Sequence, residues 1–266
     1  RLLEQDKMKL NVINNNHGTE SKAWYSLKPL QQYHDAQGID TVWGMGSRNF
    51  TTIMNSKRTG KPYILSDMPY WDRWNPLKQA VNPSGEYRWR VSYCNIHCNQ
   101  IHDVPHDRIK QIDIKEWRTQ GEYVLIAPSS PTLHSFIGQQ NWIDQTVAFL
   151  KTQTDMPIKI RHKPRKGGKS GPAYALVPLA DDLAGADCVV TSCSMVAVDA
   201  VIQGIPVYSH ELSATNLVSN RLESFGNHLR PDNREQWLAS LSYHQFTGDE
   251  FANGMFASVF KELYQI

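Results

Sequence analysis

The chain has 266 residues, of which 40% are hydrophobic and 20% charged, and its formal net charge is +2. This composition is typical of a folded globular protein and excludes a disordered or fibrous chain. No apolar stretch approaches the roughly 20 residues of a membrane span, and residues 1–10 lack the apolar core of a secretory signal, so we expect a cytoplasmic protein with no membrane span. The charge is too small to predict nucleic-acid binding from bulk electrostatics, so any such surface must be local.

The first half of the chain alternates between strand and helix patterns. Residues 1–7 are an extension whose function the sequence does not indicate. In chain order, the pattern predicts a strand at 8–15, a helix at 26–37, a strand at 39–43, a helix at 48–57 and a strand at 61–66. This alternation favours a parallel sheet with crossover helices. From residue 67 to about residue 116 the pattern is irregular, aromatic and basic.

The second half repeats the alternation after a polar linker at 117–121. It predicts a strand at 122–127, a loop at 128–131, a helix at 142–152, a strand at 158–161, a strand at 186–190, a helix at 195–203 that ends at Gly204, and a strand at 205–208. The fold class is therefore α/β, with two Rossmann-like domains that face each other across a cleft. The first domain spans 8–118 and the second 121–248, and ligands are expected at the carboxyl ends of the strands.

The cysteines do not predict a metal site. The chain has four of them, Cys94, Cys98, Cys188 and Cys193. Neither close pair has the CxxC spacing of structural zinc sites. His102 and His106 lie near the first pair, but Pro105 between them prevents their placement on one regular helical turn. We expect reduced thiols and no metal.

The segment after the strand at 186–190 is the clearest candidate for ligand binding. It runs through Thr191, Ser192 and Ser194 into a helix that carries Asp199. A hydroxyl-rich turn at the start of a helix offers N–H groups and a positive dipole to an anion, so we predict a diphosphate site, with Asp199 bonded to the two hydroxyls of a ribose. The alternative is an ordinary strand, cap and helix, with Asp199 solvated.

Two further segments complete the predicted site. Arg161, His162 and Lys163 follow the preceding strand, so their side chains are expected at the same sheet edge, close to the same phosphates. Asp67 follows the strand at 61–66 and is the predicted catalytic base that deprotonates an acceptor hydroxyl. The alternative for Asp67 is a residue that forms a turn before Pro69. No Asp-x-Asp pair occurs in the chain, which favours chemistry without a metal.

The aromatic and basic segment allows two interpretations. Its side chains can stack on bases or bind a nucleic-acid backbone, which makes Trp71, Arg73, Trp74, Arg88 and Arg90 candidate acceptor-binding residues. Alternatively, residues 87–93 form one strand with aromatic side chains directed inward and arginines outward. On sequence alone, packing is the favoured interpretation.

The segment from Thr191 to Val207 resembles the donor-binding segment of GT-B glycosyltransferases, including the capsule-type transferases. In these enzymes a serine-rich turn precedes a helix with an acidic residue and then Gly-x-Pro. The chain is also similar to phage and prophage glycosyltransferase-like proteins, over residues 60–67, 87–92, 160–164 and 234–247. The family's acidic residue is often glutamate, whereas this chain has Asp199.

The resemblance implies a GT-B-like enzyme that transfers a sugar from a nucleotide sugar, with a UDP-linked donor and no metal. It implies donor binding by Arg161, Lys163, Ser192, Ser194 and Asp199, and a closing helix at 249–266 that returns to the first domain. Phage enzymes of this kind glycosylate hydroxymethylated pyrimidines, so a 5-hydroxymethylpyrimidine in DNA is the first expected acceptor. A surface polysaccharide or glycolipid is the alternative acceptor. A binding module without catalysis, for a nucleotide sugar or a nucleic acid, is a further alternative.

Overall fold

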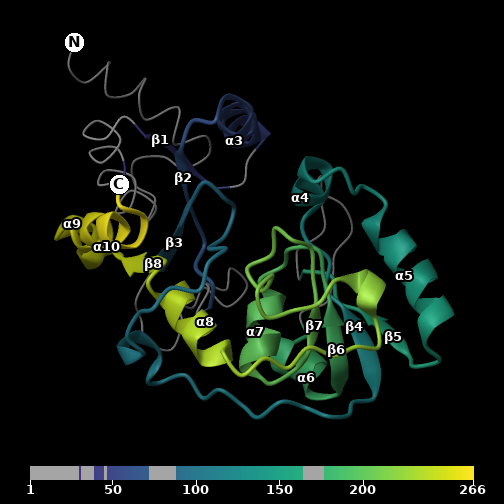
Figure 1. Cartoon of the computed structure of the whole chain (residues 1–266). Coiled ribbons are helices and arrows are strands. Elements are labelled where there is room, and N and C mark those ends of the chain that lie inside the picture. The colour runs from purple at the N-terminus through teal and green to yellow at the C-terminus, as the bar shows by residue number, and fades with distance from the viewer. Residues whose placement is uncertain (1–29, 31–38, 45–46, 72–87, 164–176) are drawn as a thin grey trace. The chain divides into compact units, whose positions relative to one another are not determined.

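The computed structural model describes residues 30, 39–44, 47–71, 88–163 and 177–266 (Figure 1). The chain forms two compact units: unit 1 comprises Arg1–Cys98 and Ser240–Ile266, and unit 2 comprises Asn99–Ala239. The chain thus leaves unit 1 once and returns to it for its last residues. The strand predicted at 8–15 lies outside the described residues, as does the helix predicted at 26–37 apart from Leu30.

Unit 1 contains a mixed four-stranded sheet in the order β1-β2-β3-β8. Strands β1 (Asp40–Trp43) and β2 (Tyr63–Asp67) are parallel and are joined by helix α3 (Ser47–Thr59), which confirms the predicted strand, helix and strand. Strands β3 (Arg88–Tyr93) and β8 (Gln245–Thr247) pair antiparallel to their neighbours. The expectation of a fully parallel first sheet was therefore wrong. Strand β3 pairs with β2 in the opposite direction, and the fourth strand, β8, comes from the far end of the chain.

The core of unit 1 is aromatic and joins the sheet to the C-terminal helices. Trp89 of β3 and Phe246 of β8 pack with phenylalanines of two helices, α9 (Gly248–Ala252) and α10 (Met255–Tyr264). Edge-to-face ring pairs are frequent among them, with centroids 5.6 Å apart for Phe246 and Phe251. The expected closing helix at 249–266 is two helices, because Gly254 adopts a positive φ of 83° between them.

Unit 2 contains a parallel four-stranded sheet in the order β5-β4-β6-β7. The strands are β4 (Tyr123–Ile126), β5 (Ile158–Ile160), β6 (Ala186–Val190) and β7 (Val207–Tyr208). They confirm the four strands predicted for this half, although β7 is shorter. Two helices flank the sheet in Figure 1, α5 (Trp142–Gln153) and α7 (Val196–Ile202).

The packing of unit 2 follows the alternation of side chains along its strands. Val124, Ile126 and Val190 lie in one buried cluster with Trp142 and Leu150 of α5, so α5 covers that face of the sheet. Helix α7 packs against β6 and β7 through a run of small and branched side chains that are fully or nearly fully buried. The described part of the unit also contains shorter elements: a 3-10 turn η1 (Asp107–Ile109), α4 (Pro131–Phe136), α6 (Leu179–Ala184) and a 3-10 turn η2 (Leu222–Ser224).

The segment before β4 belongs to unit 2 and does not form a linker between domains at 117–121. The backbone N–H of Lys115 donates to Ile202 O at 2.9 Å, and that of Arg118 donates to Gly204 O at 2.6 Å. The Arg118 guanidinium also donates to the carbonyls of Leu183 and Ala186. These bonds fix the segment along the end of α7, so the change of unit falls at residues 98–99. Helix α8 (Arg234–Ser242) contains the second change, at residues 239–240.

Among the described helices, none combines the length and the apolar character needed to cross a membrane.

Candidate functional site

The strand order of unit 2 places a topological switch point between β4 and β6. From β4 the chain continues to β5 on one side and then crosses to β6 on the other side. In open parallel sheets, ligands bind outside the carboxyl ends of the strands at such a point. Here the two loops at this position are residues 127–130 after β4 and residues 191–195 after β6. Both are rich in serine and threonine.

Hydrogen bonds made by hydroxyl groups join these two loops. Thr191 Oγ1 donates to Ala127 O at 2.6 Å, and Ser192 Oγ donates to Ser129 Oγ at 2.6 Å. Ser129 Oγ also accepts from the N–H of Cys193 at 2.9 Å. Ser129 is half-buried, whereas Ser192 is fully buried. The predicted residues Thr191 and Ser192 are therefore buried residues that hold the two loops together, and Ser129 lies closer to solvent.

His134 is a functional candidate that sequence reasoning missed. It lies on α4, and its Nε2 is 2.9 Å from Ser192 Oγ. Burial lowers the pKa of His134, which favours the neutral ring. Since Ser192 Oγ donates to Ser129, it accepts from His134 Nε2–H. The relay runs from His134 through Ser192 to Ser129, whose own hydroxyl proton is then available to a ligand oxygen.

The loop after β7 adds a second imidazole to this edge of the sheet. The backbone N–H of His210 donates to Ser192 O at 3.0 Å, which holds the loop against the serine turn. His210 Nδ1 accepts from the N–H of Leu212 at 3.1 Å, so the ring proton is on Nε2. Burial is the largest influence on the pKa of His210 and lowers it. His210 can thus act as a neutral hydrogen-bond donor.

The predicted basic residues after β5 have different environments. The Arg161 guanidinium forms an ion pair with Asp182 and donates to Val177 O at 2.9 Å. Its side chain is 11% exposed, and its charge is already neutralised by a carboxylate. Lys163 is exposed, and His162 is half-buried. Of these three residues, Lys163 is therefore the best placed to bind a phosphate by its charge.

Asp182 makes the stability of unit 2 sensitive to acid. Burial raises the pKa of this carboxyl, but hydrogen bonds and charges from Lys159 and Arg161 outweigh burial, so its pKa lies below the usual value. A lowered folded-state pKa contributes stability above the ordinary Asp pKa of about 4, and that stability is lost as the pH falls through the folded value. We expect Asp182→Asn to cost about 1–3 kcal/mol at neutral pH and to flatten the acid limb of an unfolding-versus-pH curve. The control variant Asp181→Asn, which changes the exposed neighbour, should alter neither the stability at neutral pH nor the acid limb of the curve.

Ser194 and Asp199 remain predicted donor-binding residues. Ser194 is half-buried, its N–H donates to Thr191 Oγ1 at 3.1 Å, and its Oγ accepts from the N–H of Val196 at 3.4 Å. The sequence allows either Ser192 or Ser194 to cap this helix, but the N-cap position of α7 is Met195, which makes no side-chain cap. The Ser192 hydroxyl bonds to Ser129 and His134 instead. Asp199 lies in the first turn of α7 and is half-buried.

Asp67 of unit 1 is held by a buried arginine. The two residues are cross-strand partners in β2 and β3, and Arg90 Nη2 donates to Asp67 Oδ2 at 2.9 Å. Asp67 Oδ1 accepts from the N–H of Met68 at 2.7 Å, and Arg90 Nη1 donates to Met68 O at 2.6 Å. The side chains of Arg90 and Asp67 are 5% and 19% exposed. Asp67 is thus partly exposed to solvent, while the buried Arg90 guanidinium neutralises its charge.

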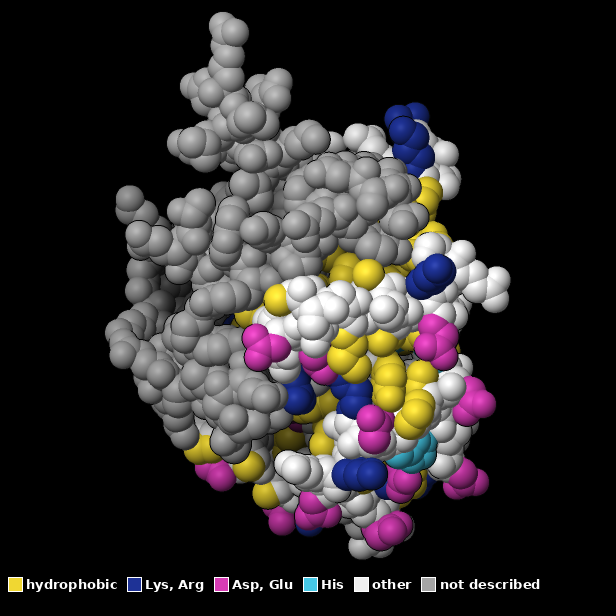
Figure 2. Space-filling model, turned by 90° about the vertical axis from the view of Figure 1, so that its left-hand side faces the viewer, with side chains coloured by type: hydrophobic (Ala, Val, Ile, Leu, Met, Phe, Trp, Pro, Cys, Tyr) yellow, Lys and Arg dark blue, Asp and Glu magenta, His cyan; other side chains and the backbone are white. Residues whose placement is uncertain are grey.

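The predicted acceptor-binding residues do not form a basic surface where the structure describes them. Trp71 and Arg90 are buried, and Arg88 is half-buried. Arginines directed outward from β3 were therefore a wrong expectation for Arg90, because Asp67 and Met68 O hold it inside. Arg73 and Trp74 lie outside the described residues. On the face shown in Figure 2, acidic and basic side chains are interspersed over the described surface.

Comparisons with known proteins give a distant likeness only. No family model and no curated protein matches the chain. Among solved structures, it is similar to a Thermosulfurimonas dismutans KpsC named as a beta Kdo 2,4 transferase, with 12% identity and a TM-score of 0.44 over 75% of this chain and 78% of that one. It is also similar to a KpsC of the same organism named as a beta Kdo 2,7 transferase, with 11% identity and a TM-score of 0.46 over 97% of each chain. At these values the likeness transfers neither residue roles nor activity.

Proposed function

We propose that this chain is a glycosyltransferase that takes a sugar from a nucleotide sugar and binds the donor phosphates at the switch point of unit 2. The relay from His134 through Ser192 to Ser129 carries this proposal, because it leaves a half-buried hydroxyl proton at the sheet edge where ligands bind. Lys163 supplies positive charge, and His210 supplies a neutral donor from the next loop. Asp199 is the proposed partner of the ribose hydroxyls, and a UDP-linked donor is the first to test.

A saccharide hydroxyl is the acceptor that we propose, and not a base in DNA. Binding of duplex DNA rests on exposed cations that neutralise phosphates. Arg90, one of the cations expected to do so, is buried and paired with Asp67. A hydroxyl of a polysaccharide or glycolipid needs no such basic surface. Binding to DNA that weakens steeply with salt would contradict this choice of acceptor.

Donor affinity tests the site directly. We expect Lys163→Ala to weaken nucleotide-sugar binding by about 10- to 150-fold, since a charge-assisted hydrogen bond contributes about 1.5–3 kcal/mol. Ser129→Ala should weaken it less, by about two- to tenfold, through loss of one neutral donor. Isothermal titration with nucleotide sugars of different nucleobases measures both effects.

The matched control for the lysine is Lys151→Ala, which removes an exposed lysine from the last turn of α5. It should bind the donor as the unchanged protein does. Equal losses in Lys163→Ala and Lys151→Ala would indicate a general effect of charge and contradict a site at this loop. Absence of binding by every nucleotide sugar would contradict the proposed function itself.

A further inference from the structure

A group of possible metal ligands lies at the amino end of β6, the end opposite to the serine turn. Asp187, Cys188 and His228 each offer one ligand atom, and these atoms lie within 4.8 Å of one another. Cys188 is fully buried, while the His228 and Asp187 side chains are 19% and 10% exposed. All three belong to unit 2. The group combines a thiol, an imidazole and a carboxylate, which are the ligand types that zinc binds.

A bulge in the sheet brings two consecutive residues into this group. Neighbours along a regular strand point to opposite faces. Here Tyr123 pairs with Ala186 and Val124 with Cys188, so Asp187 is the extra residue of β6. Cys188 then faces the cluster that contains Tyr208. A bulge redirects a side chain in this way, so Asp187 and Cys188 both reach His228.

Gly121 shows how tightly the bulge is held. A Cβ atom at Gly121 would lie 2.2 Å from the backbone nitrogen of Asp187. Since only glycine lets another backbone approach so closely, the position of Asp187 is determined by the chain that passes it. The carboxylate is therefore placed by the fold and not by a flexible loop.

Tyr208 orients the imidazole toward the other two residues. His228 Nδ1 is 3.1 Å from Tyr208 Oη, and His228 Nε2 is 3.0 Å from Asp187 Oδ2. Tyr208 Oη is itself fixed, because it accepts from the N–H of Gly226 at 3.0 Å. Histidines that bind metals usually have the second ring nitrogen hydrogen-bonded to an orienting group, as here.

We propose that Asp187, Cys188 and His228 bind one Zn²⁺ ion, with a fourth position open to water. Ligand atoms around a tetrahedral zinc lie roughly 3.3–3.6 Å apart, so the group needs only side-chain adjustment. Burial and the charge of Asp187 raise the pKa of the Cys188 thiol, which is protonated without a metal. On binding, a Cys188 S–Zn bond forms and the thiol proton leaves to solvent.

The ion would connect the segment around His228 to β6, which carries the other two ligands. Hydrogen bonds also hold that segment, such as Asn220 Nδ2 to Asn227 O at 2.6 Å and Arg230 Nε to Arg118 O at 3.0 Å. A metal that binds the folded state alone stabilises it by mass action. The site lies apart from the donor loops, so this inference goes beyond the proposed function and does not depend on it.

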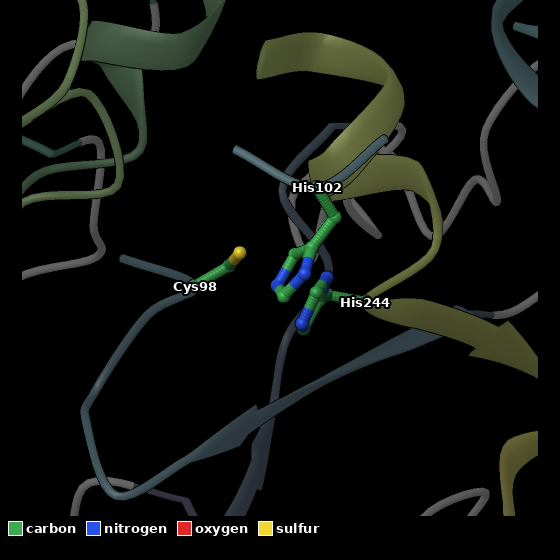
Figure 3. A group of neighbouring side chains, drawn as sticks. All are labelled: Cys98, His102 and His244. Atoms are coloured by element: carbon green, nitrogen blue, oxygen red, sulfur yellow. The ribbon is translucent and has the colours of Figure 1, made fainter. Parts of the chain in front are cut away.

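A second group of possible ligands, Cys98, His102 and His244, is drawn in Figure 3. Cys98 and His244 belong to unit 1 and His102 to unit 2, so we infer no site from it. Cys98 nevertheless supplies the control for the test of the first group.

Titration of the metal-free full chain with Zn²⁺ and Co²⁺ tests the site. We expect one equivalent of zinc per chain, a higher unfolding temperature with zinc, and a thiolate-to-cobalt charge-transfer band with Co²⁺. Because Cys188 is in the core, the diagnostic variant is His228→Gln, which changes a partly exposed side chain. It should reduce the affinity for both metals at least tenfold, so that the band appears only at correspondingly higher Co²⁺ concentration. Tyr208→Phe should retain the band but weaken binding by about 10- to 100-fold.

Cys98→Ser is the matched control and should bind both metals as the unchanged protein does. Absence of stoichiometric zinc binding would overturn the proposal and leave an Asp187–His228 hydrogen bond beside a protonated thiol. A cobalt band that appears at unchanged Co²⁺ concentration in His228→Gln but is lost in Cys98→Ser would also overturn it.

Discussion

Gly204→Ala is expected to destabilise unit 2 by about 2–5 kcal/mol, and Gly204→Val to prevent the unit from folding. Gly204 ends α7 with a φ of 70°, a conformation that costs a residue with a Cβ about 1–2 kcal/mol. A Cβ there would also lie 1.9 Å from the carbonyl oxygen of Glu116. Relief of this overlap requires displacement of packed backbone, for which overpacking costs of about 1–3 kcal/mol are typical.

The displaced backbone is the segment that precedes β4, so the effect of the substitution should be strongest near that segment. Arg118 N–H donates to Gly204 O, and Lys115 N–H donates to Ile202 O. Amide exchange in β4 and β6 should therefore accelerate in Gly204→Ala, together with a lower midpoint of urea unfolding. Gly138→Ala is the matched control, since Gly138 has a φ of 71° but nothing within 4 Å of the added Cβ. Similar losses in both variants would contradict the role of the contact with Glu116.

The elements of unit 2 could be predicted because their signals are local. The strand at 186–190 is a continuous run of buried residues, and Gly204 marks the end of the helix that follows it. The serine turn between them also follows from the sequence, and it lies at the switch point. What the local pattern could not show is the strand order, which depends on crossover connections.

The missed features depend on contacts between residues distant in sequence. His134 lies on a short helix that begins after Ser130, whose side chain accepts from the N–H of Leu133, with proline at the first position. That Ser-Pro pair was a usable signal for the helix. The bond from His134 to Ser192 spans 58 positions and has no such signal. The burial of Arg90 likewise has no local signal. A cation on a strand is ordinarily predicted to be solvated, and its pairing with Asp67 cannot be read from the sequence.

Asp67→Asn is expected to reduce sugar transfer by roughly 10²- to 10⁴-fold if Asp67 is the base that deprotonates the acceptor. The same change removes the counter-ion of a buried guanidinium, and loss of one partner of a buried pair costs about 3–5 kcal/mol. Arg90 is 5% exposed, so water has little access to its guanidinium once Asp67 is neutral. Loss of activity in the single variant therefore has two possible causes, one chemical and one structural.

The double variant Asp67→Asn/Arg90→Met separates these causes. Replacement of both members of a buried ion pair by uncharged side chains is often neutral for stability, so the double variant should recover most of the unfolding free energy that Asp67→Asn loses. If Asp67 is the base, transfer stays low in the double variant, while nucleotide-sugar affinity is unchanged because the proposed donor site lies in unit 2. A double variant that folds and transfers sugar at the original rate would show that Asp67 only balances Arg90. Donor binding without transfer in the unchanged protein would instead favour a binding module that lacks catalysis.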